Sequence, residues 1–282
     1  MRKTLCAAIA LAAFTTAAQS AQAVSDVWAF DIRALPTPGG RMLRFPVNAP
    51  APNVVIPSLS FDSFAMDFDQ TATTLFAVNG GAAPFTWGTI NQTTGAFTSL
   101  GTMTLPAGHN PTGLSCAPDG TFYLSTNGTS GNQLNTVNPA TGAVTFGPLM
   151  TGLAATAINI DIAIDRNGQM YGHDIDADTL LRIDKVTGAA TVIGPTGQAA
   201  NFAQGMDFDW DTNTLYATIY TGGGTGVFAQ MNLTTGAAQT IVSTTSWNAE
   251  MEMAVKAGIP EPSSLSLLAL TGAGVLRRRR RA

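Results

Sequence analysis

Acidic side chains recur at one position of a repeated strand pattern, and carboxylates are the groups in this chain best suited to chemistry. Aligning the repeated segments by their turns places five residues at equivalent positions, namely Asp67, Ser115, Ala163, Asp207 and Glu252. Asp161 and Glu250 lie two positions earlier in their own segments. If the segments converge on one axis, these carboxylates repel one another and their pKa values rise, unless a cation or water lies between them. Hard oxygen ligands suit calcium, so Asp67, Asp207 and Glu252 form a candidate calcium site, and the alternative is a water-filled channel lined by solvated acids.

A second acidic stretch, HDIDADT, begins like an EF-hand calcium loop. It places Asp174, Asp176 and Asp178 at alternate positions, as the first three ligands of such a loop require. The loop also needs Gly at its sixth position and Glu at its twelfth, where this chain has Thr179 and Lys185. The stretch is therefore interpreted as an acidic hairpin loop.

Residues for acid–base or nucleophilic catalysis are few. His109 and His173 stand beside turn residues, which predicts solvated loop histidines rather than bases. Cys116 lies in an apolar segment and is predicted to be a small core residue. No Gly-x-Ser-x-Gly elbow is present. Two facing carboxylates could hydrolyse glycosides, so a hydrolase stays open, although no long insertion that would shape a substrate cleft interrupts the repeats.

Aromatic residues on predicted loops are candidate platforms for sugars. Phe85 and Trp87 lie in NGGAAPFTWG, and Tyr220 precedes TGGGTG. The other repeats have no matching aromatic residue, so a repeated sugar site is not indicated. Trp247 lies near the end of the repeats and is expected to pack where the array closes.

The elements that position these residues belong to a repeat. Its recurring phrase is INQTTGAFTSLG, VNPATGAVTFGP, IDKVTGAATVIG and MNLTTGAAQTIV, with Asn or Asp at 91, 138, 184 and 232. The spacings are 47, 46 and 48 residues, which with strand-like segments predicts the blades of a β-propeller. Each repeat is predicted to form four short strands, and the glycine of its Thr-Gly pair supplies the positive φ of a hairpin turn.

The two ends of the array predict how the ring closes. DVWAFDI, GRMLRFPV and PNVVIPS resemble second, third and fourth strands, and a first strand is missing before them. NAEMEMAV, at the other end, resembles a first strand. The sequence therefore predicts an all-β propeller of five four-stranded blades, in which the last strand of the body completes the first blade.

The N-terminus has the three parts of a secretory signal peptide. Arg2 and Lys3 precede an apolar run, and Ala21 and Ala23 fit the small-x-small rule of signal peptidase cleavage. Residues 1–23 are thus predicted to be removed, which leaves residues 24–259 as the propeller domain and residues 260–282 as a tail.

The tail combines Pro260, Glu261 and Pro262 with an apolar segment at 263–276 and five arginines, which are Arg277, Arg278, Arg279, Arg280 and Arg281. The segment is shorter than the ~20 residues that span a bilayer comfortably, and flanking arginines hold their end in the cytoplasm. This order of features resembles the PEP-CTERM sorting signal of Gram-negative bacteria. The resemblance implies that an exosortase recognises the Pro-Glu-Pro residues and removes the tail after a transient stay in the inner membrane. It also implies a link to exopolysaccharide and biofilm matrix. The body resembles secreted bacterial propeller repeats.

Charge limits the partners of the body. Residues 24–259 contain seven basic and 17 acidic residues, a net charge of −10, which disfavours nucleic acid. Two functions remain. The first is a non-catalytic surface or matrix protein, processed by signal peptidase and exosortase, whose propeller binds a polysaccharide or a surface protein or is structural. The second is an extracytoplasmic, glycosidase-like hydrolase that uses the axial carboxylates.

Overall fold

The structure is a computed structural model that describes residues 24–32, 40–202, 204–247 and 250–257. The predicted signal peptide, with Ala21 and Ala23, and the predicted sorting tail, with its Pro-Glu-Pro and arginine residues, lie outside the described residues. No helix in the described ranges is long and apolar enough to cross a membrane.

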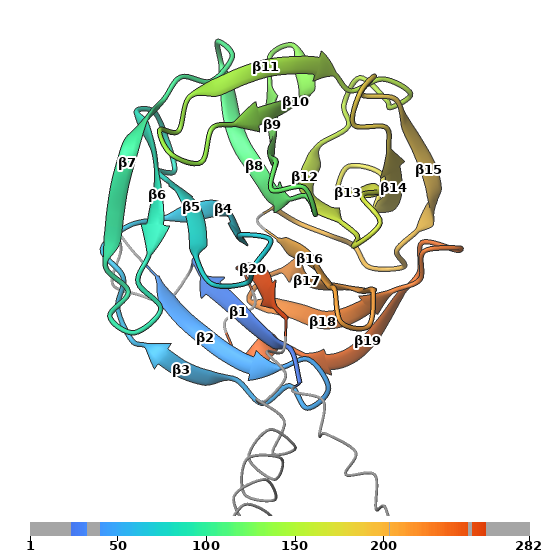
Figure 1. The fold of residues 1–282 in the computed structure, drawn as a ribbon. Coiled ribbons are helices and arrows are strands. Elements are labelled where there is room, and N and C mark those ends of the chain that lie inside the picture. The colour runs from blue at the N-terminus through green and yellow to red at the C-terminus, as the bar shows by residue number, and fades with distance from the viewer. Residues whose placement is uncertain (1–23, 33–39, 203, 248–249, 258–282) are drawn as a thin grey trace, which may run out of the picture. The chain divides into compact units, whose positions relative to one another are not determined.

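The described strands form five antiparallel sheets of four strands, as the sequence predicted, and Figure 1 shows these blades arranged around a central axis. Blade 1 consists of β20 (Met251–Lys256), β1 (Asp26–Asp31), β2 (Arg41–Pro46) and β3 (Asn53–Ile56). Blade 2 consists of β4 (Ser63–Phe68), β5 (Leu75–Asn79), β6 (Phe85–Ile90) and β7 (Phe97–Met103). Blade 3 consists of β8 (His109–Cys116), β9 (Phe122–Gly128), β10 (Gly131–Val137) and β11 (Val144–Leu149). Blade 4 consists of β12 (Asn159–Ile164), β13 (Met170–Asp174), β14 (Thr179–Ile183) and β15 (Ala190–Pro195). Blade 5 consists of β16 (Gly205–Asp209), β17 (Thr214–Gly222), β18 (Thr225–Met231) and β19 (Ala238–Ser243), and the 3-10 helix η1 (Thr245–Trp247) follows.

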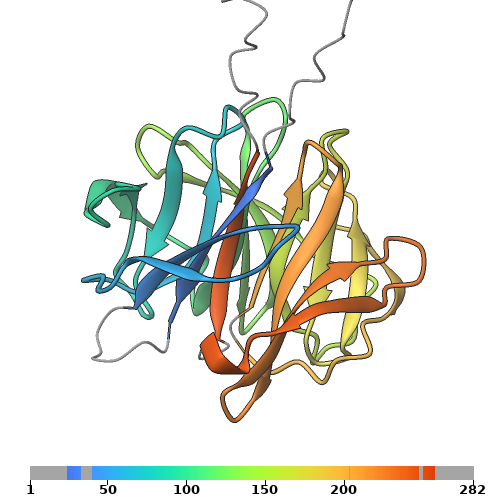
Figure 2. The same ribbon diagram turned by 90° about the horizontal axis from the view of Figure 1, so that it is seen from below.

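The predicted closure of the ring is confirmed. β20, the last described strand, pairs antiparallel with β1, the first, over six residues from Asp26 opposite Lys256 to Asp31 opposite Met251. Figure 2 shows the two strands side by side, β20 in red and β1 in blue. This pairing removes the edges that both strands would otherwise expose. Trp247 packs its ring against Phe45 of β2, with centroids 5.1 Å apart, so it contributes to the closure as expected.

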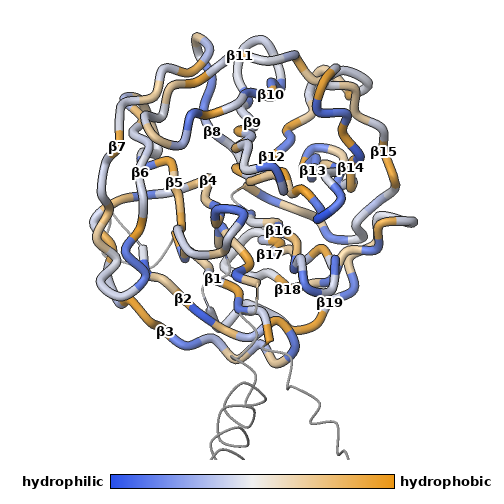
Figure 3. Tube along the Cα trace, viewed as in Figure 1, coloured by the Kyte–Doolittle hydropathy of each residue, from blue (hydrophilic) through white to orange (hydrophobic). Residues whose placement is uncertain are grey.

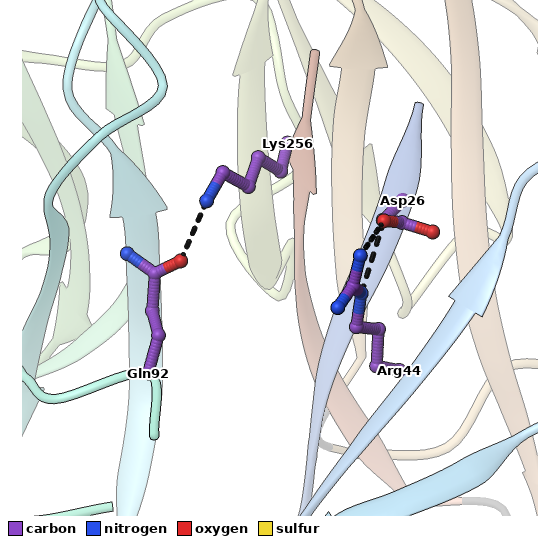
Figure 4. A network of polar contacts seen from close by, with 4 residues as sticks. All are labelled: Asp26, Arg44, Gln92 and Lys256. Carbon is purple, nitrogen blue, oxygen red and sulfur yellow. Dashed lines mark hydrogen bonds and ion pairs between the residues drawn. The ribbon is translucent and has the colours of Figure 1, made fainter. Parts of the chain in front are cut away.

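Strands of blade 1 also make two polar contacts near the closure. The Lys256 ammonium group at the end of β20 donates to the side-chain oxygen of Gln92 in blade 2 at 2.7 Å. Arg44 of β2 pairs with Asp26 of β1. Figure 4 shows both contacts. Because the Arg44 side chain is half exposed, this ion pair contributes little to stability, and the burial of apolar side chains is the larger effect.

The core is divided among the five interfaces between neighbouring blades. Successive side chains of a strand point to opposite faces of its sheet, and here both faces are covered. In β1, Trp28 and Phe30 pack towards blade 2, whereas Val27 and Ala29 pack towards blade 5. Three further clusters fill the interfaces between blades 2 and 3, 3 and 4, and 4 and 5. Figure 3 shows the resulting interleaving of hydrophobic and hydrophilic residues along the strands.

The repeated phrase forms the turn between the third and fourth strands of blades 2 to 5. In the turn of blade 2, the Asn91 side-chain oxygen accepts from the main-chain N–H groups of Thr93 and Thr94, and Gly95 N–H donates to the Asn91 carbonyl at 2.8 Å. The turn glycines 95, 142, 188 and 236 have φ between 73° and 82°. Each also lies against the preceding blade. A Cβ on Gly142, for example, would come within 2.5 Å of the Trp87 Cβ. The predicted turn role is confirmed, and close packing between blades is a second reason for glycine.

Candidate functional site

Five inner strands, β4, β8, β12, β16 and β20, surround the axis, and each neighbouring pair of them is in contact. The second strand of each blade carries an aromatic residue, and the residue opposite it on the inner strand marks equivalent positions in the five blades. The residues opposite these aromatic residues are Asp67, Ser115, Ala163, Asp207 and Ala254. Four of the five predicted equivalent positions are therefore correct. The fifth is wrong by two residues, because Ala254 lies opposite Trp28 while Glu252 lies opposite Phe30, at the level of Asp161.

Side chains of the inner strands join all five blades in a closed ring. In each case a side-chain oxygen accepts a hydrogen bond from a main-chain N–H of the next inner strand, and we call these five contacts the blade links. They run from Cys116 N–H to Asp67 (2.7 Å), Ile164 N–H to Ser115 Oγ (3.0 Å), Met206 N–H to Asp161 (2.5 Å), Val255 N–H to Asp207 (2.6 Å) and Met66 N–H to Glu252 (3.2 Å). The axial acids thus hold neighbouring inner strands together.

The blade links explain why the acids occupy two levels. Blades 2, 3 and 5 place Asp67, Ser115 or Asp207 opposite the aromatic residue, and these side chains make the link. Blades 4 and 1 have alanine at this position, which offers no side-chain acceptor. There the acid two residues earlier, Asp161 or Glu252, makes the link instead.

The aspartates of the ring use both carboxylate oxygens. In addition to the blade link, each accepts from the N–H of the residue that follows it, at 2.6 Å for Asp67, 2.7 Å for Asp161 and 2.7 Å for Asp207. The four linking acids are at most 6% exposed. The expected alternative of solvated acids lining a channel is therefore wrong, because these carboxyl groups are buried in contact with main-chain donors.

Burial raises the pKa of all four acids. The pKa of Asp67 lies well above its usual value because of burial and then the nearby charge of Asp207. Burial raises the pKa of Asp207 to about 7, although two N–H donors oppose the shift, and the two carboxyl groups are hydrogen-bonded to each other. Burial, followed by the charge of Glu252, raises the pKa of Asp161, and burial also raises the pKa of Glu252. Raised pKa values on two carboxyl groups in contact favour one proton held between Asp67 and Asp207.

A metal site receives no support from this geometry. No group of three or more His, Cys, Asp or Glu side chains in the described part of the chain is placed to hold a metal ion. Asp67 and Asp207 meet at one level of the axis, whereas Glu252 lies at the other. Calcium binding by these three residues stays a prediction.

The acidic loop of blade 4 also has a structural explanation. Asp174 accepts from the N–H groups of Ile158 and Asp176, and the Asp178 side chain accepts from Ala200 N–H at 2.7 Å. Asp176 accepts from the Thr156 hydroxyl. The three carboxylates bind separate partners, in agreement with the interpretation of this stretch as a turn.

Both histidines are strand residues, which corrects the prediction of solvated loops. His109 begins β8 with 4% of its surface exposed, and its ring nitrogens contact the hydroxyls of Thr126 and Ser130. His173 lies in β13, 1% exposed, and burial lowers its pKa to about 4. Glycine and proline neighbours suggested loops, but pairing with the adjacent strands decides the structure.

The predicted loop aromatics are likewise buried. Phe85 and Trp87 belong to β6, and Tyr220 belongs to β17, each at most 4% exposed. None is a platform for a sugar. Cys116, at the end of β8, is a core residue as predicted, and burial raises the pKa of its thiol.

Cavities lie at opposite ends of the axis. The small cavity, about 40 Å³, lies at the C-terminal ends of the inner strands beside Asp67, Asp207 and Trp210. The large cavity, about 260 Å³, lies at their N-terminal ends. Its lining comes from all five blades and consists of Phe64, Pro111, Thr112, Ile160, Phe202, Gln204, Glu250 and Glu252. The large cavity was not predictable from the sequence, because its residues share no motif and converge only when the ring closes.

Two families match separate parts of the chain. Residues 64–251 match a family described as a repeat of unknown function (DUF6923), and residues 258–281 match the PEP-CTERM protein-sorting motif. No curated protein matches the sequence.

Solved structures resemble the propeller at low identity. A chain of the nidogen/laminin complex has a TM-score of 0.48 at 10% identity, covering 83% of this chain and 98% of that chain. TolB from Acinetobacter baumannii has a TM-score of 0.49 at 13% identity, covering 78% of this chain and 53% of its own. A protein from Lactobacillus plantarum has a TM-score of 0.45 at 17% identity, covering 79% of this chain and 66% of its own. This chain therefore spans about half the length of TolB. These likenesses carry no functional argument.

Proposed function

The chain belongs to the DUF6923 family, and we propose that it is an exosortase-sorted surface or extracellular-matrix protein whose propeller is a non-catalytic binding or structural module. The PEP-CTERM motif supports export and a membrane-anchored stage before surface display. The arrangement of the axial acids supports the non-catalytic role of the body.

The blade links carry this proposal. A glycosidase needs two carboxyl groups that reach the substrate from opposite sides, about 5–9.5 Å apart, one protonated and one ionised. Here the carboxyl groups of Asp67 and Asp207 contact each other, and each accepts main-chain hydrogen bonds within a packed axis. Bringing either acid to a substrate would break a contact between blades. The hydrolase alternative has no supporting observation.

Processing at both ends is the route to the surface. Signal peptidase is expected to cleave after Ala23, which releases Val24 as the new N-terminus. The apolar segment 263–276 and the arginines that follow it would hold the tail at the inner membrane. Exosortase would then recognise Pro260, Glu261 and Pro262 and remove the tail. A polysaccharide or a surface protein is the expected partner of the displayed propeller.

Intact-mass measurement tests the sorting step. We expect the protein recovered from the surface of an exosortase-containing host to lack residues 1–23 and the arginine cluster. In the same host without its exosortase, the protein should keep the arginines and fractionate with membranes. Replacing Glu261 with Gln tests whether the motif is required. Surface protein that still carries Arg277–Arg281 would contradict the proposal.

A hydrolysis assay tests the non-catalytic role. The purified protein should release no chromophore above background from aryl glycosides of common hexoses. Activity that disappears in a folded Asp207→Asn variant would instead identify the axial acids as catalytic.

A further inference from the structure

The large cavity combines space, aromatic rings and buried polar atoms at the entrance to the axis. Its volume of about 260 Å³ approaches the lower limit of small-molecule sites. Because its lining comes from every blade, its shape is fixed by the ring as a whole. It lies at the end of the axis away from the Asp67–Asp207 pair.

Gln204 is the polar residue that points to a ligand. Its side chain is 2% exposed, and its Nε2 donates to the Tyr220 carbonyl at 3.3 Å. A carbonyl can only accept, so this contact fixes the orientation of the amide. The Oε1 atom is then left buried with no hydrogen-bond partner. A buried acceptor without a donor is destabilising, and a ligand that supplies the donor would recover this cost.

The rest of the lining has the same preference for a donor. Two carboxyl groups, of Glu250 and Glu252, line the cavity, and no Lys or Arg is among its lining residues. The Thr112 hydroxyl is already hydrogen-bonded to the Ser125 hydroxyl at 2.9 Å. The polar groups facing the ligand are therefore mainly acceptors, and the surrounding propeller is acidic.

Aromatic rings complete the lining. Phe64 and Phe202 both border the cavity, and Phe202 is 68% exposed. The faces of aromatic rings attract cations, because the ring quadrupole is negative there. Phe202 has φ of 41°, a conformation that bulky side chains rarely adopt. An exposed phenylalanine in this backbone conformation gains nothing from the core, whereas a ligand in the cavity would cover it.

We propose that the large cavity binds a small organic ammonium ion, whose N–H groups donate to Gln204 Oε1 and to a carboxyl oxygen of Glu252 while Phe64 and Phe202 surround its carbon frame. This inference rests on the proposed role of the propeller as a binding module and names its ligand class. Anions are disfavoured because the lining holds no Lys or Arg and its polar groups are mainly acceptors. A neutral alcohol of the same shape supplies one donor and no charge, so it binds more weakly.

Calorimetry with matched probes tests the ligand class. The purified protein is titrated with n-butylammonium and n-butanol, and separately with glucosamine and glucose. These pairs distinguish an aliphatic frame from a sugar frame. We expect saturable binding of at least one ammonium at one site, at least tenfold tighter than its neutral counterpart. Equal binding of both members of each pair, or no saturable binding of either ammonium, would overturn the inference.

Variants locate the site. Gln204→Leu should weaken ammonium binding at least tenfold, and Phe202→Ala, which changes an exposed side chain and spares the core, should weaken it severalfold. The matched control is Phe146→Ala, which removes another exposed phenylalanine, on the outer strand β11, and should leave binding unchanged. If the Gln204→Leu variant fails to fold, the Phe202→Ala variant by itself tests whether the ligand binds in the large cavity. Unchanged binding in a folded Phe202→Ala variant would place the ligand elsewhere. Correct trimming and surface display without ammonium binding would overturn this inference alone.

Discussion

At the scale of single residues, the acids at the axis act as main-chain acceptors. The sequence predicted that Asp67 and Asp207 are equivalent and that repulsion between the axial acids would raise their pKa values. The equivalence and the direction of the shift are confirmed, but burial rather than repulsion is its first cause. The position of Glu252 could not be fixed, because Glu250 and Glu252 alternate with methionines and a two-residue slip keeps every side chain on the same face of the strand. Only pairing with Trp28 and Phe30 of β1 decides the level.

The shared proton predicts that stability falls as pH rises. An acid whose pKa is higher in the folded than in the unfolded protein binds its proton more tightly when folded. Its contribution is fully present below the unfolded pKa, about 3.9 for Asp, and is lost as pH rises through the folded pKa, about 7 for Asp207. Urea denaturation at pH 4.5 and 7.5 should show the loss, up to about 1.4 kcal/mol per pH unit for each such group.

Asp207→Asn should flatten this pH dependence, because it removes one titrating group and keeps an acceptor oxygen for Val255 N–H. Asp119→Asn is the matched control, because the Thr121 N–H lowers the pKa of this exposed aspartate and the slope between pH 4.5 and 7.5 should stay nearly unchanged. Stability that rises with pH between 4.5 and 7.5 would contradict the shared proton.

The same two proteins test calcium binding at the axis. A bound calcium ion would raise the melting temperature of the wild-type protein more than sodium does at matched ionic strength. The Asp207→Asn variant would lose this difference.

At the scale of elements, the Thr-Gly turn does more than reverse the chain. Its φ above 70° was predictable from the sequence, because Asn, Thr and Gly in this order are typical of turns. Its packing against the preceding blade was not, because that contact joins residues about 50 positions apart, such as Trp87 and the turn of blade 3. The Trp87 indole N–H donates to the Pro139 carbonyl in the same turn, at 2.9 Å. The repeat therefore includes the interface between blades.

Two glycine variants separate these effects. Gly142 and Gly197 have φ of 73° and 75°, but a Cβ on Gly197 would meet nothing within 4 Å. Gly197→Ala should lower the free energy of unfolding by about 1–2 kcal/mol, because alanine is strained in this left-handed backbone conformation. Gly142→Ala adds a clash with Trp87 and should cost about 1–3 kcal/mol more. Chemical denaturation of both variants measures the difference, and equal losses would show that the turn conformation alone requires the glycine.

At the scale of the whole molecule, five similar sheets become one domain because their contacts run around a ring. The blade count and the joint first blade could be predicted from the spacing of the phrase and from the missing first strand. The large cavity could not, because Phe64, Thr112, Ile160, Gln204 and Glu252 lie far apart in the sequence and meet only at the entrance to the closed axis. Closure of the ring therefore both stabilises the fold and forms the large cavity.

The last prediction tests the ring itself. A chain that ends after Ala257 keeps β20, whereas a chain that ends after Glu250 loses it. The loss removes Met251, Met253 and Val255, each at most 6% exposed and worth about 1.5–3 kcal/mol when buried. It also removes two of the five blade links and exposes the edge of β1 that faces the axis, while the pairing of β1 with β2 remains. The sum approaches the stability of a whole domain, about 5–15 kcal/mol. We therefore expect the longer chain to be monomeric with a cooperative thermal transition, and the shorter chain to aggregate or to show no transition by circular dichroism and size-exclusion chromatography. Equal melting temperatures for the two chains would mean that four blades are stable without the joint blade.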